Sequence, residues 1–300
     1  MSGGLTVLLT GALATVQDRG RPGHSDLGVG VSGAADRPAL ALANRLVGNG
    51  AGAAGIEVTA GGLVCRAEER LVVAVTGATG PVLVRRPSGS LRPAGLARPE
   101  VLAVGDELRV GVPDRGLRSY VAVRGGVDVA PVLGSRSTDL LAGLGPAPLR
   151  PGDVLPVGSD VAGPVLASDG APVSAPDDGE VTLYAVPGPR ADWFGDDALR
   201  AVFGRPWEVT SASNRVGMRL QGSELVRASR RVGAELPSEG VARGAIQVPA
   251  SGQPLVFLAD HPVTGGYPVV AVLRDRDVDV AAQLRPGQRI RLRAQPAPMF

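Results

Sequence analysis

The sequence predicts an all-β fold with a few short helices, and three observations support this fold class. Short runs rich in Val and Leu recur along the chain, bounded by Gly, Pro or Asp. The 43 glycines and 26 prolines are scattered rather than periodic, which is typical of many short strands joined by turns. Helical spacing of apolar residues is clear in only two segments. A chain of 300 residues can bury one large core or two medium ones.

The strongest strand candidates are short apolar runs flanked by turn residues, as in a barrel or a sandwich. They are residues 71–75, 108–112, 119–123, 181–186, 255–258 and 269–273.

The first predicted helix covers residues 36–47, where apolar residues follow helical spacing. Asp36 is its expected N-cap, Pro38 suits the first turn, and Gly48 ends it. A second helix is expected over residues 192–203, before Gly204, and a short helical turn over residues 278–284.

Two similar heptapeptides stand late in each half of the chain. Residues 149–155 read LRPGDVL and residues 284–290 read LRPGQRI, a pattern typical of a turn that enters a strand. The repetition indicates either two related units or a common turn used twice. Residues 159–180 are rich in Ala, Pro, Ser, Asp and Gly without apolar periodicity, so a linker is expected there.

The basic residues exclude several kinds of chemistry. The chain has no lysine, and all 31 basic residues are arginine. A Schiff-base lysine and a phosphate-loop lysine are therefore impossible, and an anion must be held by Arg forks or backbone N–H groups. The formal charge of +2 and the aromatic content of 3% argue against a nucleic-acid partner.

Cysteine and histidine are too few for a metal centre. Cys65 is the only cysteine, and His24 and His261 are far apart in sequence, so no metal site is predicted. No apolar run reaches membrane-spanning length and the N-terminus lacks a leader-like pattern, which predicts a cytoplasmic protein with no membrane partner.

Four segments carry candidate functional residues. In residues 15–36, a glycine-punctuated loop presents Gln17, Asp18, Arg21 and Ser32 ahead of a helix N-terminus. The alternative there is an ordinary surface loop with a surface Asp–Arg pair. Glu57 is the one charge in a predicted strand, and pointing to solvent is its default interpretation.

In residues 213–222, Asn214 suits a plain turn, whereas Arg215 and Arg219 could grip a carboxylate or phosphate. Residues 244–268 place Gln247, Gln253 and the Asp260–His261 pair in one stretch, and this stretch then ends in Gly265-Gly266-Tyr267. Neighbouring residues of a strand point to opposite faces, so an Asp260–His261 relay is not expected.

Six segments in order resemble the KipA family, which comprises the C subunits of 5-oxoprolinase and the allophanate hydrolase subunit 2-like proteins. They read TVQDRGRPG, VSGAADRPALALANRLVGN, IEVTAGG, SNRVGMRLQG, SEGVARGAIQVPASGQPLVFLAD and TGGYP. The resemblance implies a cyclophilin-like β-barrel architecture, with a barrel-like subdomain in residues 1–165 and a cyclophilin-like one in residues 166–300.

The resemblance also implies a function. It points to the C subunit of an ATP-dependent 5-oxoprolinase, a hydrolase that converts 5-oxoproline to glutamate. The implied partners are a KipI-like B subunit, a LamB/YcsF-type A subunit and a small carboxylate substrate, with ATP and Mg bound by the complex. The alternatives are half of a biotin-dependent carboxyltransferase, and a non-catalytic binder that antagonises a KipI-like kinase inhibitor.

The family motifs imply a set of site residues. The catalytic candidates are Asp260, Glu57 and Arg215, and the substrate-binding candidates are Gln17, Asp18, Arg21, Ser32, Asn214, Arg219, Gln247, Gln253, Gly265, Gly266 and Tyr267. Family members often read Asp-Arg-Gln-Thr-Thr before the double glycine. Here His261 and Pro262 stand in place of the Arg and Gln, so no substrate role is assigned to them.

Overall fold

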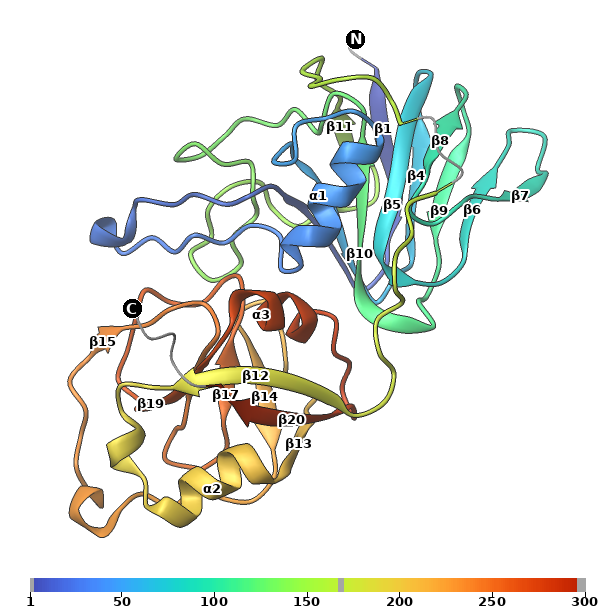
Figure 1. Ribbon diagram of the computed structural model, residues 1–300. Coiled ribbons are helices and arrows are strands. Elements are labelled where there is room, and N and C mark those ends of the chain that lie inside the picture. The colour runs from blue at the N-terminus through green and yellow to red at the C-terminus, as the bar shows by residue number, and fades with distance from the viewer. Residues whose placement is uncertain (1–2, 167–169, 296–300) are drawn as a thin grey trace. The chain divides into compact units, whose positions relative to one another are not determined.

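The computed structural model describes residues 3–166 and 170–295, and the chain divides into two compact units (Figure 1). Unit 1 contains the chain as far as Arg21, together with Ser32–Asp139 and Gly143–Pro176. Unit 2 contains Pro22–Val31, Leu140–Ala142 and the chain from Asp177 onward.

Unit 1 is a sandwich of two antiparallel sheets. The six-stranded sheet has the order β11 (Val154–Pro156), β1 (Gly4–Thr10), β4 (Leu63–Ala67), β9 (Glu107–Val110), β6 (Val82–Arg85), β7 (Leu91–Pro93). The five-stranded sheet has the order β2 (Leu13–Gln17), β3 (Gly55–Thr59), β10 (Arg115–Val123), β5 (Leu71–Thr79), β8 (Pro99–Leu102). Alternating apolar residues of both sheets, such as Leu5 and Val7 of β1 and Ile56 and Val58 of β3, form one buried core.

Helix α1 (Arg37–Leu46) covers the other face of the five-stranded sheet, over β10 and β5 (Figure 1). As predicted, Asp36 caps it, because the Asp36 carboxylate accepts the Ala39 N–H at 3.0 Å. Leu46 packs with Ala74 and Ala122 of the sheet. Gly48 then adopts a left-handed backbone with φ of 76°, which ends the helix.

Unit 2 is built on a closed seven-stranded barrel, so the predicted barrel architecture is confirmed. Its order is β12 (Val181–Pro187), β19 (Val269–Leu273), β16 (Ala245–Gln247), β17 (Leu255–Phe257), β14 (Gly217–Gln221), β13 (Pro206–Val209), β20 (Arg289–Ala294). The ring closes where β20 pairs parallel with β12 and antiparallel with β13. Met218 and Leu220 of β14 face the apolar core, while Arg219 and Gln221 face outward.

The shorter elements of unit 2 lie outside the barrel. They are α2 (Asp196–Gly204), α3 (Asp275–Ala281), the ribbon of β15 (Glu239–Gly240) and β18 (Thr264–Gly265), and the 3₁₀ turns Ser25–Leu27, Ala191–Trp193 and Ser229–Arg231. The helix predicted over residues 192–203 is split in two. Phe194 adopts an extended backbone (φ −118°, ψ 148°) and is buried next to Trp193 in the barrel core, so the helix restarts only at Asp196.

Both heptapeptides are turns that enter a strand, as their sequences predict. Gly152 (φ 95°) precedes β11 and Gly287 (φ 85°) precedes β20. The two strands nevertheless belong to different architectures. The described strands of unit 1 form a two-sheet sandwich where the sequence suggested a barrel-like subdomain. Part of the expected linker, residues 167–169, lies outside the described residues.

Candidate functional site

Asp18 organises a loop within unit 1. Its Oδ1 accepts the Gly20 N–H at 2.7 Å and the hydroxyls of Ser135 and Ser137 at 2.6 and 2.5 Å. Its Oδ2 accepts the Arg136 N–H at 2.6 Å. The carboxylate is buried and saturated with donors. The surface Asp–Arg pair considered as one interpretation is therefore wrong, because Asp18 holds the chain around residues 135–137.

Arg21 anchors the same loop. It is 1% exposed, and its guanidinium donates to the carbonyl oxygens of Ser137 and of Val132, the latter at 3.4 Å. Its Nη1 lies 3.7 Å from Asp139 Oδ2. The Arg21 guanidinium thus contacts other residues of unit 1, and Arg21 has a structural role beside the candidate site.

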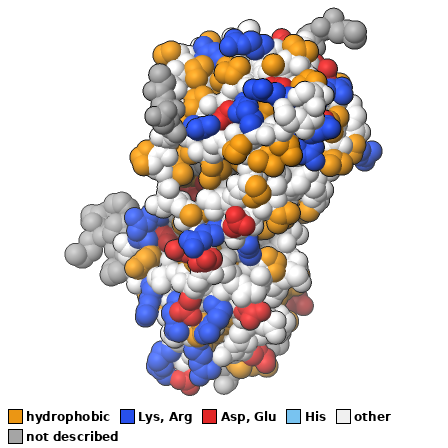
Figure 2. Space-filling model, turned by 90° about the vertical axis from the view of Figure 1, so that its right-hand side faces the viewer, with side chains coloured by type: hydrophobic (Ala, Val, Ile, Leu, Met, Phe, Trp, Pro, Cys, Tyr) orange, Lys and Arg blue, Asp and Glu red, His pale blue; other side chains and the backbone are white. Residues whose placement is uncertain are grey.

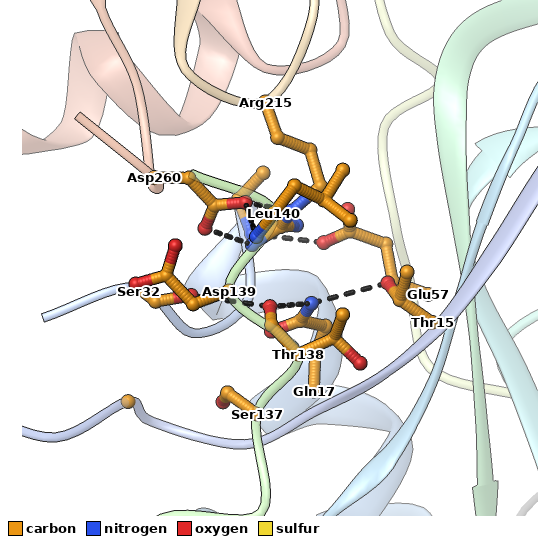
Figure 3. A network of polar contacts seen from close by, with 12 residues as sticks. Thr15, Gln17, Ser32, Glu57, Ser137, Thr138, Asp139, Leu140, Arg215 and Asp260 are labelled. Carbon is orange, nitrogen blue, oxygen red and sulfur yellow. Dashed lines mark hydrogen bonds and ion pairs between the residues drawn. The ribbon is translucent and has the colours of Figure 1, made fainter. Parts of the chain in front are cut away.

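Gln17 and Ser32 converge on Thr138, which the sequence did not mark (Figure 3). The Gln17 side-chain N–H₂ donates to Thr15 Oγ1 at 3.1 Å and to the Thr138 carbonyl at 2.9 Å. The Ser32 hydroxyl donates to the same carbonyl at 3.2 Å, from a backbone with φ of 55°. Gln17 Oε1 and Thr138 Oγ1 are buried and have no hydrogen-bonding partner among the described residues. Such orphan groups are uncommon and often mark functional sites.

Glu57 points to the helix-covered face of its sheet and is 1% exposed, so its default interpretation as a solvent-facing residue is wrong. Its Oε2 accepts the Tyr120 O–H at 2.8 Å and the Ala35 N–H at 2.9 Å. Its Oε1 lies 3.6 Å from Arg118 Nε. Glu57 is buried because α1 and the chain that leads into it cover this face, which alternation alone does not reveal.

The N-terminus of α1 is already occupied by protein acceptors. The Ala34 N–H donates to the Asp18 carbonyl at 2.9 Å, and the Asp36 N–H donates to Tyr120 Oη at 2.7 Å. The Ala35 and Ala39 N–H groups go to Glu57 and Asp36. The N–H groups that the sequence offered to an anion are therefore used to fix the loop and the helix.

In unit 2, Arg215 and Asp260 form a buried bidentate ion pair (Figure 3). Nε and Nη2 of Arg215 each donate to an Asp260 oxygen at 2.9 Å, and each residue is 1% exposed. Asp260 Oδ2 also accepts the Leu140 N–H at 3.2 Å. His261 makes a separate contact, with Nδ1 2.7 Å from the Pro262 carbonyl oxygen.

Asn214 acts in the turn before β14. Its side-chain oxygen accepts the N–H groups of Val216 and Gly217 at 2.8 and 3.1 Å. This is the turn role that an Asn favours.

Arg219 and Gln253 line one cavity of about 360 Å³ on the outside of the barrel. Thr210 and Ser251 also line it. The Gln253 amide accepts the Gly222 N–H at 2.9 Å and so bridges two segments of the wall. The structure therefore brings these two candidates together, at a distinct place from the Arg215–Asp260 pair.

Gln247 holds the end of the β15–β18 ribbon. Its side-chain N–H₂ donates to the Tyr267 carbonyl at 3.0 Å, and a Cβ added at Gly265 would lie only 2.5 Å from that nitrogen. At the other strand, Glu239 binds the Arg190 guanidinium through both oxygens. The hydrogen bonds from Arg190 hold the pKa of Glu239 below its ordinary value. Tyr267 itself is half exposed.

Figure 2 shows Arg side chains interspersed with acidic and apolar ones over the view, in keeping with the net charge of +2. Within residues 3–166 and 170–295, no cluster of three His, Cys, Asp or Glu side chains is arranged to hold a metal ion. In the same part of the chain, every helix is too short or too polar to span a membrane.

Comparisons with known proteins give one consistent answer. The family model described as "Carboxyltransferase domain, subdomain A and B" matches residues 27–294. The C subunit of 5-oxoprolinase from Escherichia coli is 38% identical over 95% of this chain and 89% of its own length.

Two solved structures extend the comparison to the fold. The crystal structure of TTHA0988 matches with a TM-score of 0.84 and 35% identity, over 97% of this chain and 56% of that one. The Kluyveromyces lactis urea amidolyase matches with a TM-score of 0.88 and 29% identity, over 97% of this chain and 19% of that one. This chain therefore spans about half of the first and about a fifth of the second. The family model and the length-wide match to the E. coli protein show that the chain belongs to the carboxyltransferase domain family, subdomain A and B, with the KipA-type members that its six motifs resemble.

Proposed function

We propose that this chain is the C subunit of an ATP-dependent 5-oxoprolinase. The observation that carries the proposal is colinearity: this chain and its E. coli relative match over 95% and 89% of their lengths. The match to the K. lactis urea amidolyase covers only 19% of that much longer protein. The match over nearly the whole length of a subunit therefore favours the subunit over the multidomain protein, of which only a fifth is matched.

The proposed reaction opens a five-membered lactam. With one ATP and two molecules of water, 5-oxoproline gives glutamate, ADP and phosphate. The ring C–N bond breaks, one water ends in the new carboxylate and the other in the phosphate, and the ring nitrogen becomes the ammonium group of glutamate. We propose that a KipI-like B subunit and a LamB/YcsF-type A subunit take part, since the E. coli relative is named as one of several subunits of its enzyme.

Within unit 1, the proposed substrate contacts follow from the orphan groups. Gln17 Oε1 is a buried acceptor without a partner among the described residues, and a lactam N–H is a donor of the matching kind. The Thr138 hydroxyl matches the lactam carbonyl in the same way. We propose Glu57 as the proton acceptor, because it is a buried carboxylate whose orientation is held by contacts with Tyr120, Ala35 and Arg118.

ATP with Mg is proposed as a cofactor of the complex, and no residue of this chain is assigned to it. The N–H groups at the start of α1 are taken by protein acceptors, and the described residues hold no cluster of carboxylates suited to a metal. With no lysine in the chain, phosphate contacts from it would have to come from arginine or from backbone N–H groups elsewhere than the start of α1.

The deciding assay measures glutamate formation from 5-oxoproline and ATP with the three purified proteins, omitting each in turn. The proposal requires that turnover stops without this chain. Turnover that survives its omission contradicts the proposal. A chain that binds the B subunit on gel filtration but adds nothing to turnover would identify the non-catalytic binder instead.

A carboxyltransferase half remains the second candidate, favoured by the TM-score of 0.88 to the urea amidolyase. It would require biotin delivered on another protein. Transfer of a carboxyl group from carboxybiotin to urea, measured with this chain and a KipI-like partner, would establish that function.

A further inference from the structure

A row of buried polar side chains crosses the five-stranded sheet beneath the start of α1. Strand pairing places Thr15 opposite Glu57, Glu57 opposite Tyr120, and Tyr120 opposite Thr76, on β2, β3, β10 and β5. All four residues are at most 1% exposed. A buried polar row under a helix is costly unless each group is hydrogen-bonded, so its contacts show what the row does.

Tyr120 makes two hydrogen bonds whose directions are fixed. The Asp36 N–H can only donate, so the phenol oxygen accepts that bond at 2.7 Å. The single phenol proton then goes to Glu57 Oε2, 2.8 Å away. The same Oε2 accepts the Ala35 N–H at 2.9 Å. Two donors on one oxygen favour the ionised form of Glu57.

Of the charged groups described near Glu57, the Arg118 cation favours its ionised form, whereas the negative charge of Asp36 opposes it. Arg118 and Tyr120 face it from β10, Asp36 lies at the start of α1, and Thr15 on β2 is uncharged. Burial raises the pKa of Tyr120 well above its ordinary value, and the negative charges of Glu57 and Asp36 raise it further. The phenol therefore remains protonated, and thus a donor, throughout the pH range of an enzyme assay.

We propose that Tyr120 is a positioning residue for Glu57, which it keeps ionised and aimed in one direction for the proposed lactam chemistry. This inference rests on the proposed function, in which Glu57 accepts a proton. Nothing in the Tyr120 contacts requires it to touch substrate. Thr76 offers a matched control on the same row, because its hydroxyl donates to the Ala39 carbonyl of α1 at 2.7 Å and it stands on β5, which β10 separates from the β3 strand of Glu57.

The test compares pH profiles of kcat/KM for the assembled complex containing Tyr120→Phe, Thr76→Val or the unchanged chain. Loss of the phenol donor raises the pKa of the Glu57 carboxyl, so the acidic limb should move up by about one pH unit, which is about a tenfold loss below the limb. Thr76→Val also removes a buried hydroxyl that connects α1 with the sheet, but the acidic limb of its pH profile should stay where it is in the unchanged chain. In Glu57→Gln, adding Tyr120→Phe should change the residual rate by less than about twofold.

The outcomes separate the inference from the proposed function. Turnover that needs this chain, with the same acidic limb in Tyr120→Phe as in the unchanged chain, overturns the positioning role and leaves the function standing. Equal shifts in Tyr120→Phe and Thr76→Val would show a merely structural role. If Tyr120→Phe does not fold by gel filtration and thermal melting, 3-fluorotyrosine at position 120 replaces it. The phenol of 3-fluorotyrosine is more acidic and therefore a stronger hydrogen-bond donor, so the acidic limb of the pH profile should move to lower pH. An acidic limb at the same pH as in the unchanged chain overturns the inference.

Discussion

The Arg215–Asp260 pair shows how residue-scale geometry changes a functional expectation. Nε and Nη2 of Arg215 are committed to Asp260, so these two donors are not offered to a substrate carboxylate. Removing one partner of a buried pair leaves an uncompensated charge, which costs far more than the pair gains when intact.

Arg215→Ala should therefore lower the free energy of unfolding by about 3–5 kcal/mol. Urea unfolding followed by tryptophan fluorescence measures this, because both tryptophans, Trp193 and Trp207, lie in the barrel core of unit 2. Arg219→Ala is the matched control. Arg219 stands four residues further on and faces outward, so its loss should cost less than about 0.5 kcal/mol. Equal losses in the two variants would contradict a structural role for the buried pair.

Glu100 gives a pH-dependent prediction in unit 1. Burial opposes its ionisation, but the Gly95 N–H and the guanidiniums of Arg92 and Arg98 outweigh burial, so the pKa of Glu100 lies below its ordinary value. A carboxyl group whose pKa is lowered by folding stabilises the folded protein at pH values above the pKa that the group has in the unfolded chain, which is about 4.3 for Glu. This contribution to the free energy of unfolding is lost as the pH falls through the lower pKa that the group has in the folded protein.

Glu100→Gln should consequently destabilise the protein at neutral pH by about 1–3 kcal/mol. The difference from the unchanged chain should shrink as the pH falls below about 4.3. Unfolding titrations at several pH values measure it, with the exposed Glu69→Gln as the control. If the difference in the free energy of unfolding stays constant down to acid pH, the ionised form of Glu100 does not stabilise the fold.

At the scale of elements, the β15–β18 ribbon depends on one close approach. A methyl group at Gly265 would lie 2.5 Å from the Gln247 amide nitrogen, whereas at Gly266 the nearest neighbour would be 3.6 Å away. Gly265→Ala should displace the Gln247 amide and break its hydrogen bond to Tyr267, at a cost of about 1 kcal/mol.

Gly266→Ala should be tolerated, since 3.6 Å is an ordinary van der Waals distance. Hydrogen exchange of the ribbon amides, compared between the two variants, measures the effect. Faster exchange in Gly265→Ala alone is expected, and equal exchange in both would show that Gln247 does not hold the ribbon.

The sequence predicted the elements better than the site. Asp36, Pro38 and Gly48 define α1 through local capping chemistry, and the strand runs are equally local. The contacts of Glu57 were not predictable, since they depend on which sheet face α1 covers. Tyr120 lies within an apolar run and Thr138 in a loop far from Gln17 in sequence, so no spacing or composition signal marked either residue.

At the scale of the whole molecule, an all-β chain with a barrel was predictable and is confirmed in unit 2, whereas the two-sheet sandwich of unit 1 was not predicted. The strands of unit 1 and unit 2 have similar lengths and compositions. Whether a sheet closes depends on pairing between its first and last strands, which no local pattern encodes.

Biotin dependence provides the whole-molecule prediction. As part of a 5-oxoprolinase, this chain should support glutamate formation at an unchanged rate when excess avidin sequesters any biotin. The control is avidin that has been saturated with free biotin beforehand and can therefore bind no more. A strong loss of the rate of glutamate formation with avidin alone would show that this reaction depends on biotin and would contradict the prediction.

The closure of the barrel has a consequence for its synthesis. β12 is the first barrel strand to leave the ribosome, and its parallel partner β20 is the last, with Val181 paired to Ile290. Until β20 emerges, β12 and β13 each keep one unpaired edge, the kind of edge that invites association with other chains. The barrel can thus complete only after nearly all of unit 2 has been translated, and nascent chains should need protection by chaperones over that interval.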